Sequence, residues 1–354
     1  MKRILILGID TFAAKNLAQI EMLSRKGYAF TIATTDRRAD SQHYFKMLGT
    51  HAHTLHVLPA HPLKRLAAVI RLLKQGPYSH IELYAAGRCT LLYLPVLKYF
   101  KCRWIVVERG DIGSMDEYSF TTRLAIQAAY RHADAVWYKE PYMHPLLDAK
   151  GARKLYFVPN AAQIPDASRG NARRDIDFLW VNRLVHVRYP DWIVRSASDP
   201  ELASRTLAML GFQDAERCEP ETLKRQIYAQ KNRPPGLSLH GFTDPFSWYP
   251  RARFFVLPAR FVFGNNALLE AMAHGVVPIV TQSPGVDMLI QDGVNGLVAD
   301  QNETSFRSAM RRAARMEKQA WESMSQAALH TIAQKFNLDT WTNSMARMYE
   351  ELAC

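Results

Sequence analysis

The sequence predicts an α/β protein with two doubly wound parallel sheets. In each half of the chain, short apolar runs alternate with segments of helical periodicity, and a polar segment separates the halves. The length of 354 residues also exceeds what one compact core usually holds, which favours two domains. Each half is therefore expected to form a parallel sheet covered by helices on both faces.

The first expected element is a buried strand at Arg3–Gly8, inside the opening MKRILILGID. Its apolar run ends at Asp10, too early for the hydrophobic region of a signal peptide. The further strands expected in this half are 29–34, 81–84, 104–108, 135–138 and 155–158, and the helices are 13–26, 63–75, 90–100, 121–132 and 142–149. In the second half we expect strands at 177–181, 206–210, 237–240, 254–257 and 276–281, and helices from about residue 303 onward.

The domain boundary is expected in residues 162–177, a polar stretch that contains Pro and Gly and lacks periodicity. We therefore predict an N-terminal domain over 1–161 and a C-terminal domain over 178–335. The last segment, 336–354, is expected to be a helix that packs back toward the N-terminal domain.

Positive charge is concentrated in the first half. Residues 1–160 hold 23 Lys and Arg against 12 Asp and Glu, whereas the remaining residues are nearly balanced. This half should face an anionic partner, and the chain has no short motif of nucleic-acid readers, so a membrane surface or an acidic acceptor ranks before nucleic acid. No apolar run reaches the roughly 18–20 residues that cross a bilayer. The four cysteines lack metal or disulfide spacing, which fits a reducing cytoplasm.

The most informative segment is 261–280, FVFGNNALLEAMAHGVVPIV. Gly264, Asn265 and Asn266 open a helix that continues through Ala267, and a buried strand follows. A helix N-terminus beside a strand end attracts anions such as phosphate. Glu270 is an isolated carboxylate among apolar residues, where a sugar hydroxyl would suit it. Taken alone, the segment favours the simpler interpretation of a capped helix with an exposed Glu.

A second candidate anion site lies in FLWVNRLVHVRYPDW. Arg183 leaves the end of the expected strand, and Arg188 follows five residues later near the start of a helix. Two cations at the carboxyl end of a strand are well placed to hold a diphosphate. Two surface arginines would give the same local pattern.

Together these segments resemble a known enzyme family. The order is strand–Arg–x4–Arg, then LHGFTD, then FGNNALLEAMAHGVVPIVT, then DGVNGLV, and VPNA precedes the linker where the family usually has VPNG. This order resembles the C-terminal domain of retaining GT-B glycosyltransferases of the family-4 type, the glycosyl transferases group 1. The resemblance covers about residues 178–298 well and is looser before them. It implies a GT-B architecture, with two Rossmann-like doubly wound domains facing across a cleft.

The resemblance assigns roles to residues of the second half. Glu270 matches the Glu that binds the ribose hydroxyls of the donor. Arg183 matches the family's Arg, Arg188 stands where the family has Lys, and this basic pair neutralises the diphosphate of the donor. Backbone N–H groups at the helix start, from Gly264 to Ala267, complete the phosphate cradle, and Gly241 lies where the backbone approaches the base. No metal or other cofactor is implied, because these cations and the helix dipole stabilise the departing diphosphate.

Three departures from the family pattern bear on specificity. Val262 stands eight residues before Glu270, where the family has a Glu that meets the donor sugar, so the resemblance leaves the donor sugar and turnover itself open. Asn182 replaces the usual Gly before Arg183. Pro284-Gly285 replaces a Gly-Gly pair near the sugar pocket.

Candidates in the first half concern the acceptor. Arg109 lies where the family often has His, and Asp111 could receive the proton of the acceptor hydroxyl, although a turn with structural ion pairs is an equal alternative. Asp10 could contact substrate or merely cap a helix. Five histidines, His43, His51, His53, His56 and His61, lack a clear metal-binding spacing, so loop or acceptor-facing roles rank before a metal site.

The expected helix at 63–75, LKRLAAVIRLLKQ, has one apolar face, and cations occupy the rest. Such a helix can lie on an anionic membrane or cover a sheet. Aromatic and cationic side chains are also interleaved in the segment that follows, at Tyr93, Lys98, Tyr99, Phe100, Lys101 and Arg103.

The function implied is a cytoplasmic glycosyltransferase of the hexosyltransferase type, at the inner face of the cytoplasmic membrane. It would move a sugar from a nucleotide-sugar donor to an anionic or lipid-linked glycan held by the N-terminal domain, in bacterial cell-surface polysaccharide or lipopolysaccharide synthesis. One rival is a GT-B sugar-nucleotide epimerase. The other is a catalytically inactive nucleotide-sugar-binding protein, which Val262 supports best.

Overall fold

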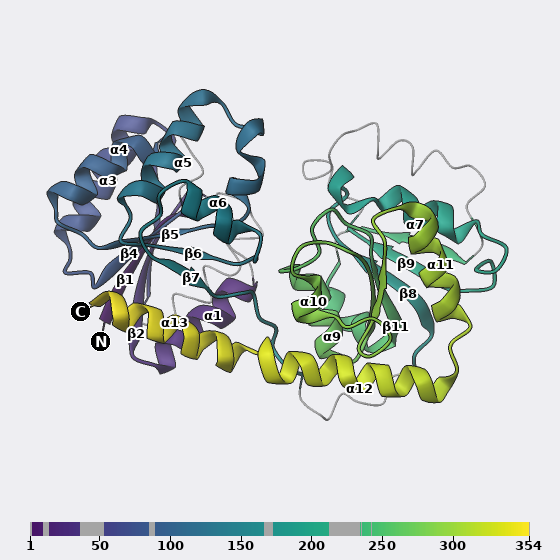
Figure 1. Ribbon diagram of the computed structural model, residues 1–354. Coiled ribbons are helices and arrows are strands. Elements are labelled where there is room, and N and C mark those ends of the chain that lie inside the picture. The colour runs from purple at the N-terminus through teal and green to yellow at the C-terminus, as the bar shows by residue number, and fades with distance from the viewer. Residues whose placement is uncertain are drawn as a thin grey trace. The chain divides into compact units, whose positions relative to one another are not determined.

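The computed structural model describes residues 2–9, 14–35, 53–84, 89–165, 173–211, 234, 236–241 and 243–353. It divides into two compact units (Figure 1). The first unit comprises Met1–Pro159 and Leu338–Cys354, and the second comprises Asn160–Asn337. Among the described residues, none of the helices combines the length and the hydropathy that crossing a lipid bilayer requires.

The first unit is built on a seven-stranded sheet in the order β3-β2-β1-β4-β5-β6-β7, in which every described pairing is parallel. Its strands are β1 (Lys2–Ile9), β2 (Tyr28–Thr34), β3 (Thr54–Val57), β4 (His80–Leu83), β5 (Trp104–Val107), β6 (Ala135–Tyr138) and β7 (Leu155–Phe157). Its helices are α1 (Ala14–Arg25), α3 (Pro62–Lys74), α4 (Thr90–Tyr99), α5 (Phe120–His132), α6 (Met143–Ala149) and α13 (Leu338–Ala353), with a 3₁₀ helix at Asp111–Glu117.

Alternate side chains of the central strands face opposite layers of helices, because successive residues of a strand point to opposite faces. Leu5 and Leu7 of β1 join the core formed with α3, α4, α5 and α6. On the opposite face, Ile6 and Glu82 lie with side chains of α1 and α13, so the sheet has helices on both sides (Figure 1). Helix α3 covers the sheet with its buried residues, which are Val69, Leu72 and Leu73, and its basic residues lie outside.

The second unit has a six-stranded parallel sheet in the order β10-β9-β8-β11-β12-β13. Its strands are β8 (Ile176–Val181), β9 (Leu207–Leu210), β10 (Leu237–His240), β11 (Ala252–Leu257), β12 (Val277–Thr281) and β13 (Leu297–Ala299). Its helices are α7 (Pro190–Ala197), α9 (Asn266–Ala273), α10 (Val286–Leu289), α11 (Glu303–Ala314) and α12 (Lys318–Lys335), with 3₁₀ helices at His186–Arg188, Pro245–Ser247 and Tyr249–Arg251. Its core is aromatic and aliphatic, with Trp180, Phe178 and Phe254 fully buried.

Both sheets follow one topology, in which the first strand of each unit lies beside its fourth. The strand order reverses between β1 and β4, and again between β8 and β11. Ligands of doubly wound sheets bind outside the carboxyl ends of the strands at such a reversal. The predicted fold class, two doubly wound parallel sheets with covering helices, is confirmed, and the expected strands lie within two residues of those observed.

Candidate functional site

The carboxyl edge of the second sheet gathers the residues that the sequence singled out. Strand β8 ends at Val181 and runs into Asn182 and Arg183, and its neighbour β11 ends at Leu257 and leads to α9. The start of α9 and the end of β8 are joined directly, because Asn265 Nδ2 donates to Asn182 Oδ1 at 2.9 Å. This pair places a strand end and a helix N-terminus side by side.

Asn265 is the cap of α9. Its Oδ1 accepts the Leu268 N–H at 3.0 Å, which satisfies one of the N–H groups that a helix start leaves without an intrahelical partner. The preceding Gly264 has φ of 79°, a conformation that favours glycine. Its carbonyl accepts the Asn160 side-chain amide at 2.7 Å. The turn is therefore fixed on both sides, and the N–H groups of Asn266 and Ala267 donate to no residue that the structure describes.

Arg183 and Arg188 differ in their surroundings. Arg183 is exposed and makes no ion pair with any residue that the structure describes. Arg188 is half-buried, and its Nη1 donates to the Phe261 carbonyl at 3.4 Å, in the loop that leads to α9. The second cation of the sequence pattern thus reaches the loop before the Gly264–Asn265 turn, while the first directly follows Asn182.

Glu270 lies in the second turn of α9 and is half-buried. Its Oε2 accepts the hydroxyl of Tyr249 at 2.9 Å. Tyr249 is 0% exposed, and burial, followed by the charge of Glu270, raises its pKa well above the usual value. The phenol therefore stays protonated and continues to donate to the carboxylate.

The departures from the family pattern have clear places in the structure. Val262 is 0% exposed, and its N–H donates to Ser283 Oγ at 3.1 Å, so this side chain belongs to the core. Gly285 has φ of 84° directly before α10. Gly241 follows β10, and its carbonyl accepts the Gly211 N–H at 3.1 Å.

Gly211 was not predicted to matter, although the structure requires it. Its φ is 109°, and a Cβ at this position would lie 2.2 Å from the Asn182 carbonyl oxygen. The backbone at the end of β9 therefore passes too close to the end of β8 for any side chain. A single Gly at the end of an apolar strand was the only signal for this in the sequence.

In the first unit, a buried carboxylate holds the turn that carries Arg109 and Asp111. Glu108 Oε1 accepts the Gly110 N–H at 2.7 Å and the Ile112 N–H at 3.2 Å, and Oε2 accepts the Tyr130 hydroxyl. Arg109 is exposed, and its guanidinium lies 5.5 Å from the centre of the Tyr84 ring. Asp111 begins a 3₁₀ helix, but its side chain lies outside the described atoms, as does all of Asp10.

The described histidines form no metal centre. The Phe30 N–H donates to His53 Nδ1 at 3.1 Å, so His53 Nε2 carries the proton and donates to Ser24 Oγ at 2.9 Å. This pairing makes His53 a structural residue. Among the parts of the chain that the structure describes, no cluster of three or more His, Cys, Asp or Glu could hold a metal ion, and His43 and His51 lie outside them.

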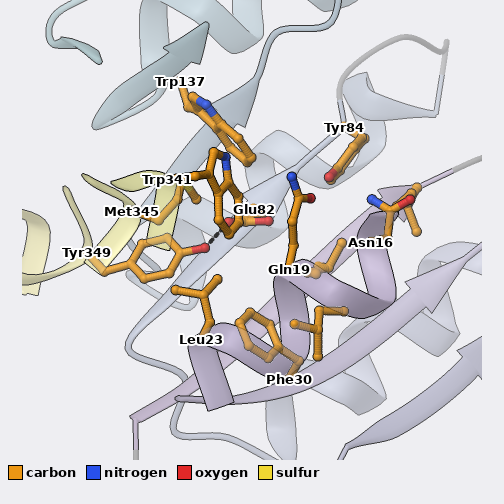
Figure 2. Close-up of a pocket in the computed structure, with 13 residues that line it drawn as sticks. Asn16, Gln19, Leu23, Phe30, Glu82, Tyr84, Trp137, Trp341, Met345 and Tyr349 are labelled. Atoms are coloured by element: carbon orange, nitrogen blue, oxygen red, sulfur yellow. Dashed lines mark hydrogen bonds between the residues drawn. The ribbon is translucent and has the colours of Figure 1, made fainter. Parts of the chain in front are cut away.

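Glu82 is a buried titratable group that the sequence reasoning passed over. It lies in β4, is 3% exposed, and accepts the hydroxyl of Tyr349 from α13 (Figure 2). Burial raises its pKa to about 7. A cavity of about 20 Å³, room for about one water molecule, lies among Glu82, Gln19 and Trp341. A charge inside the predicted strand 81–84 was the available signal.

Comparison with known proteins supports the resemblance seen in the sequence. Residues 175–315 match the family described as glycosyl transferases group 1. A glycogen synthase of Xanthomonas campestris pv. campestris is 28% identical over 184 residues, which cover 46% of this chain and 38% of the relative. The chain thus matches about two fifths of the length of this curated relative. A glycogen synthase of Xanthomonas euvesicatoria pv. vesicatoria gives the same identity over 35% of its length.

Solved structures match over almost the whole chain. A sucrose-phosphate synthase from Thermosynechococcus elongatus superposes with a TM-score of 0.78 at 17% identity, covering 99% of both chains. HepE of Anabaena, solved in complex with UDP-glucose, gives a TM-score of 0.78 at 16% identity, covering 99% of this chain and 100% of its own. At these identities the likeness establishes the fold. The family match confirms the predicted resemblance to group 1 glycosyltransferases over residues 175–315.

Proposed function

We propose that this protein is a retaining glycosyltransferase that takes a sugar from a nucleotide-sugar donor. The observation that carries the proposal is the joined strand end and helix start of the second unit, where Asn182 and Asn265 hold the N-terminus of α9 beside Arg183. Glu270 lies one turn further along the same helix. This combination of N–H groups, a cation and a carboxylate suits a diphosphate attached to a ribose. It also agrees with the glycosyltransferase family match and with the UDP-glucose bound by HepE of Anabaena.

The chemistry at such a site is electrostatic. Breaking the anomeric C–O bond leaves negative charge on the departing diphosphate. The N-terminus of α9, Arg183 and Arg188 would stabilise that charge as it develops, and they would do so without a metal ion. Retention of configuration is proposed to follow from attack on the same face that the diphosphate leaves, with no protein nucleophile.

The acceptor is assigned to the first unit because of its charge. Between Pro59 and Arg103 the sequence has eight Lys and Arg, and its one acidic residue, Glu82, is buried. Such a surface suits an anionic or lipid-linked glycan. Asp111 is the residue that would accept the proton of the attacking hydroxyl.

The same surface supports contact with an anionic membrane. Helix α3 presents Lys64, Arg71 and Lys74 on its exposed side, and Leu63 and Tyr99 are 67% and 82% exposed. Exposed cations beside apolar and aromatic side chains are typical of peripheral membrane proteins. We therefore propose that the protein works at the inner face of the cytoplasmic membrane, in the synthesis of bacterial cell-surface polysaccharide.

A donor panel tests the proposal. The protein is incubated with UDP-, GDP- and ADP-sugars, and nucleoside diphosphate release is followed with and without membrane extract. Release that depends on the extract supports a transferase. Tight binding without turnover of any donor would favour the inactive binding protein. A product with inverted anomeric configuration by NMR would exclude retention.

Two substitutions test the site itself. Glu270→Ala and Arg183→Ala should each weaken nucleoside diphosphate binding by roughly 10- to 150-fold, because each removes a charge-assisted contact of about 1.5–3 kcal/mol. The matched controls are Glu322→Ala and Arg315→Ala on α12 and after α11, both exposed and away from the carboxyl edge. Unchanged affinity in both site variants would refute the assignment.

A further inference from the structure

The carboxylate of Glu270 is held by a side chain from a distant part of the second unit. We propose that Tyr249 is a positioning residue, which fixes the Glu270 carboxylate toward the ribose of the donor and so sets the preference for a ribonucleotide. This inference rests on the proposed function and extends it to a residue that would not touch the nucleotide.

The hydrogen bond between the two side chains has an ordinary length, and its donor is shielded from solvent. Tyr249 lies in the 3₁₀ helix directly before β11, and its hydroxyl donates to Glu270 Oε2 at 2.9 Å. Because the phenol is fully buried, water does not reach the hydroxyl that donates this bond. The raised pKa of Tyr249 keeps the donor protonated across the physiological range.

Arg174 fixes Tyr249 relative to α9. Its Nη1 donates to the carbonyls of Tyr249 at 3.2 Å and Ala252 at 2.5 Å, and its Nη2 donates to the His274 carbonyl at 2.8 Å. One guanidinium thus ties the segment that carries Tyr249 to the end of the helix that carries Glu270. Planar guanidinium groups with several carbonyl acceptors leave little freedom to the segments they join.

His274, at the end of α9, contacts both Glu270 and Tyr249. Its Nδ1 donates to the Glu270 carbonyl at 2.8 Å, and its ring centre lies 5.3 Å from that of Tyr249. Tyr249 is therefore packed against His274 while it bonds the carboxylate one turn away. The phenol has a fixed position from which to orient Glu270.

Fixing one carboxylate oxygen matters because a Glu side chain otherwise samples several rotamers. Ordering those rotamers on binding lowers affinity, whereas a carboxylate that is already oriented avoids this cost. A buried phenol needs an acceptor in any core. Here the acceptor is the carboxylate of the candidate site, so loss of the hydroxyl should change ligand selectivity as well as stability.

The experiment compares a nucleotide that has ribose hydroxyls with one that lacks them. Binding of UDP, GDP and ADP is measured by calorimetry, and the tightest of the three is paired with its 2′,3′-dideoxy form. The variants are Tyr249→Phe, which removes only the hydroxyl, and Tyr349→Phe as the matched control. Tyr349 is also a buried tyrosine that donates to a buried carboxylate, Glu82, but it lies in the first unit.

The wild type should bind the dideoxy form roughly 10- to 150-fold more weakly, since the contacts to Glu270 are lost. In Tyr249→Phe the affinity for the ribonucleotide should fall about fivefold or more, and the affinity for the dideoxy form should change less than twofold. The selectivity ratio therefore falls. Tyr349→Phe should leave both affinities unchanged.

Other outcomes separate the two proposals. If no nucleotide binds the wild type, the proposed function fails, and the inference fails with it. If the wild type binds and selects, but Tyr249→Phe weakens both forms equally or neither, only the inference is overturned. The double variant Glu270→Gln with Tyr249→Phe guards against a folding defect. If Tyr249 acts through Glu270, the ratio of ribonucleotide to dideoxynucleotide affinity should be no lower in the double variant than in Glu270→Gln alone.

Discussion

Ionisation of the buried carboxylate of Glu82 should lower the stability of the first unit as the pH rises, and Glu82→Gln should remove this contribution. Burial raises the pKa of Glu82 from 4.5 to about 7, while the Tyr349 hydroxyl and Lys139 oppose the rise. In the folded state Glu82 therefore keeps its proton at pH values where the unfolded chain has lost it. Its contribution is fully present below about pH 4.5 and disappears as the pH rises through 7.

The size of the effect follows from the pKa shift. A difference of about 2.5 units, at 1.36 kcal/mol per unit, corresponds to about 3 kcal/mol between pH 4.5 and pH 8. Gln keeps an oxygen that can accept the Tyr349 hydroxyl but does not ionise. Relative to the wild type, Glu82→Gln should therefore gain about 3 kcal/mol over this range.

The neighbouring His80 contributes a pH dependence of stability with the opposite sign. The test must therefore compare Glu82→Gln with the wild type at each pH and not follow the wild type alone. Burial, followed by the charge of Lys2, lowers the pKa of His80 to about 4. Its contribution is present above the unfolded pKa of 6.5 and is lost as the pH falls through 4. Because both proteins carry His80, its contribution cancels in the difference between them.

Hydrogen exchange read by mass spectrometry on peptides of β4 and α13 is the suitable assay, since it reports the opening free energy of the first unit by itself. Measurements run from pH 5 to pH 8.5, with the intrinsic exchange rates corrected at each pH. Glu117→Gln, an exposed carboxylate of the same unit, is the control and should give a constant difference. Parallel curves for Glu82→Gln and the wild type would refute the reasoning.

Three further predictions concern the candidate site and the basic surface. Asn265→Ala removes the α9 cap and the bond to Asn182. It should therefore lower the free energy of unfolding of the second unit by about 1–2 kcal/mol in urea titrations and weaken nucleoside diphosphate binding. If both the unfolding free energy and the binding are unchanged, the proposed role of this turn is wrong. Gly211→Ala should destabilise the same unit by several kcal/mol, because its Cβ would lie 2.2 Å from a carbonyl oxygen, and a soluble variant with wild-type melting temperature would disprove it. Arg71→Glu with Lys74→Glu should reduce sedimentation with phosphatidylglycerol vesicles about tenfold or more and leave binding to phosphatidylcholine vesicles unchanged, since each cation near an anionic surface contributes about 1 kcal/mol.

The alternation of strands and helices could be predicted because it depends on local patterns. The run around Leu5 reads as a buried strand from composition alone, and so does the run around Val256. Strand β3 (Thr54–Val57) was missed because its sequence, TLHV, is short and mixed, and only pairing with β2 makes it a strand. Helix α3 was foreseen with either of two partners for its apolar face, and packing on the sheet decides between them.

Only the part of the candidate site that lies in continuous sequence motifs could be predicted. Glu270 and the turn before α9 can be proposed from the sequence because the motif is continuous. The partner of Glu270 was not found, because Tyr249 lies 21 residues earlier and a side-chain hydrogen bond leaves no periodic signal. The bond between Asn182 and Asn265 spans 83 residues and is equally invisible before folding.

That bond changes the meaning of the departure at position 182. Compared with the family pattern, Asn182 replaces the Gly that precedes Arg183. In the folded chain its side chain accepts from Asn265, the residue that caps α9, so the substitution adds a direct tie between strand end and helix start. Hydrogen-bond donors that are held in place before the substrate arrives stabilise developing charge without reorganising.

Val262 has the opposite character, because it places a buried apolar side chain where the family has a carboxylate. The diphosphate half of the proposed site is therefore reinforced and the sugar half is altered, so a search for the donor should hold the nucleoside diphosphate constant and vary the sugar.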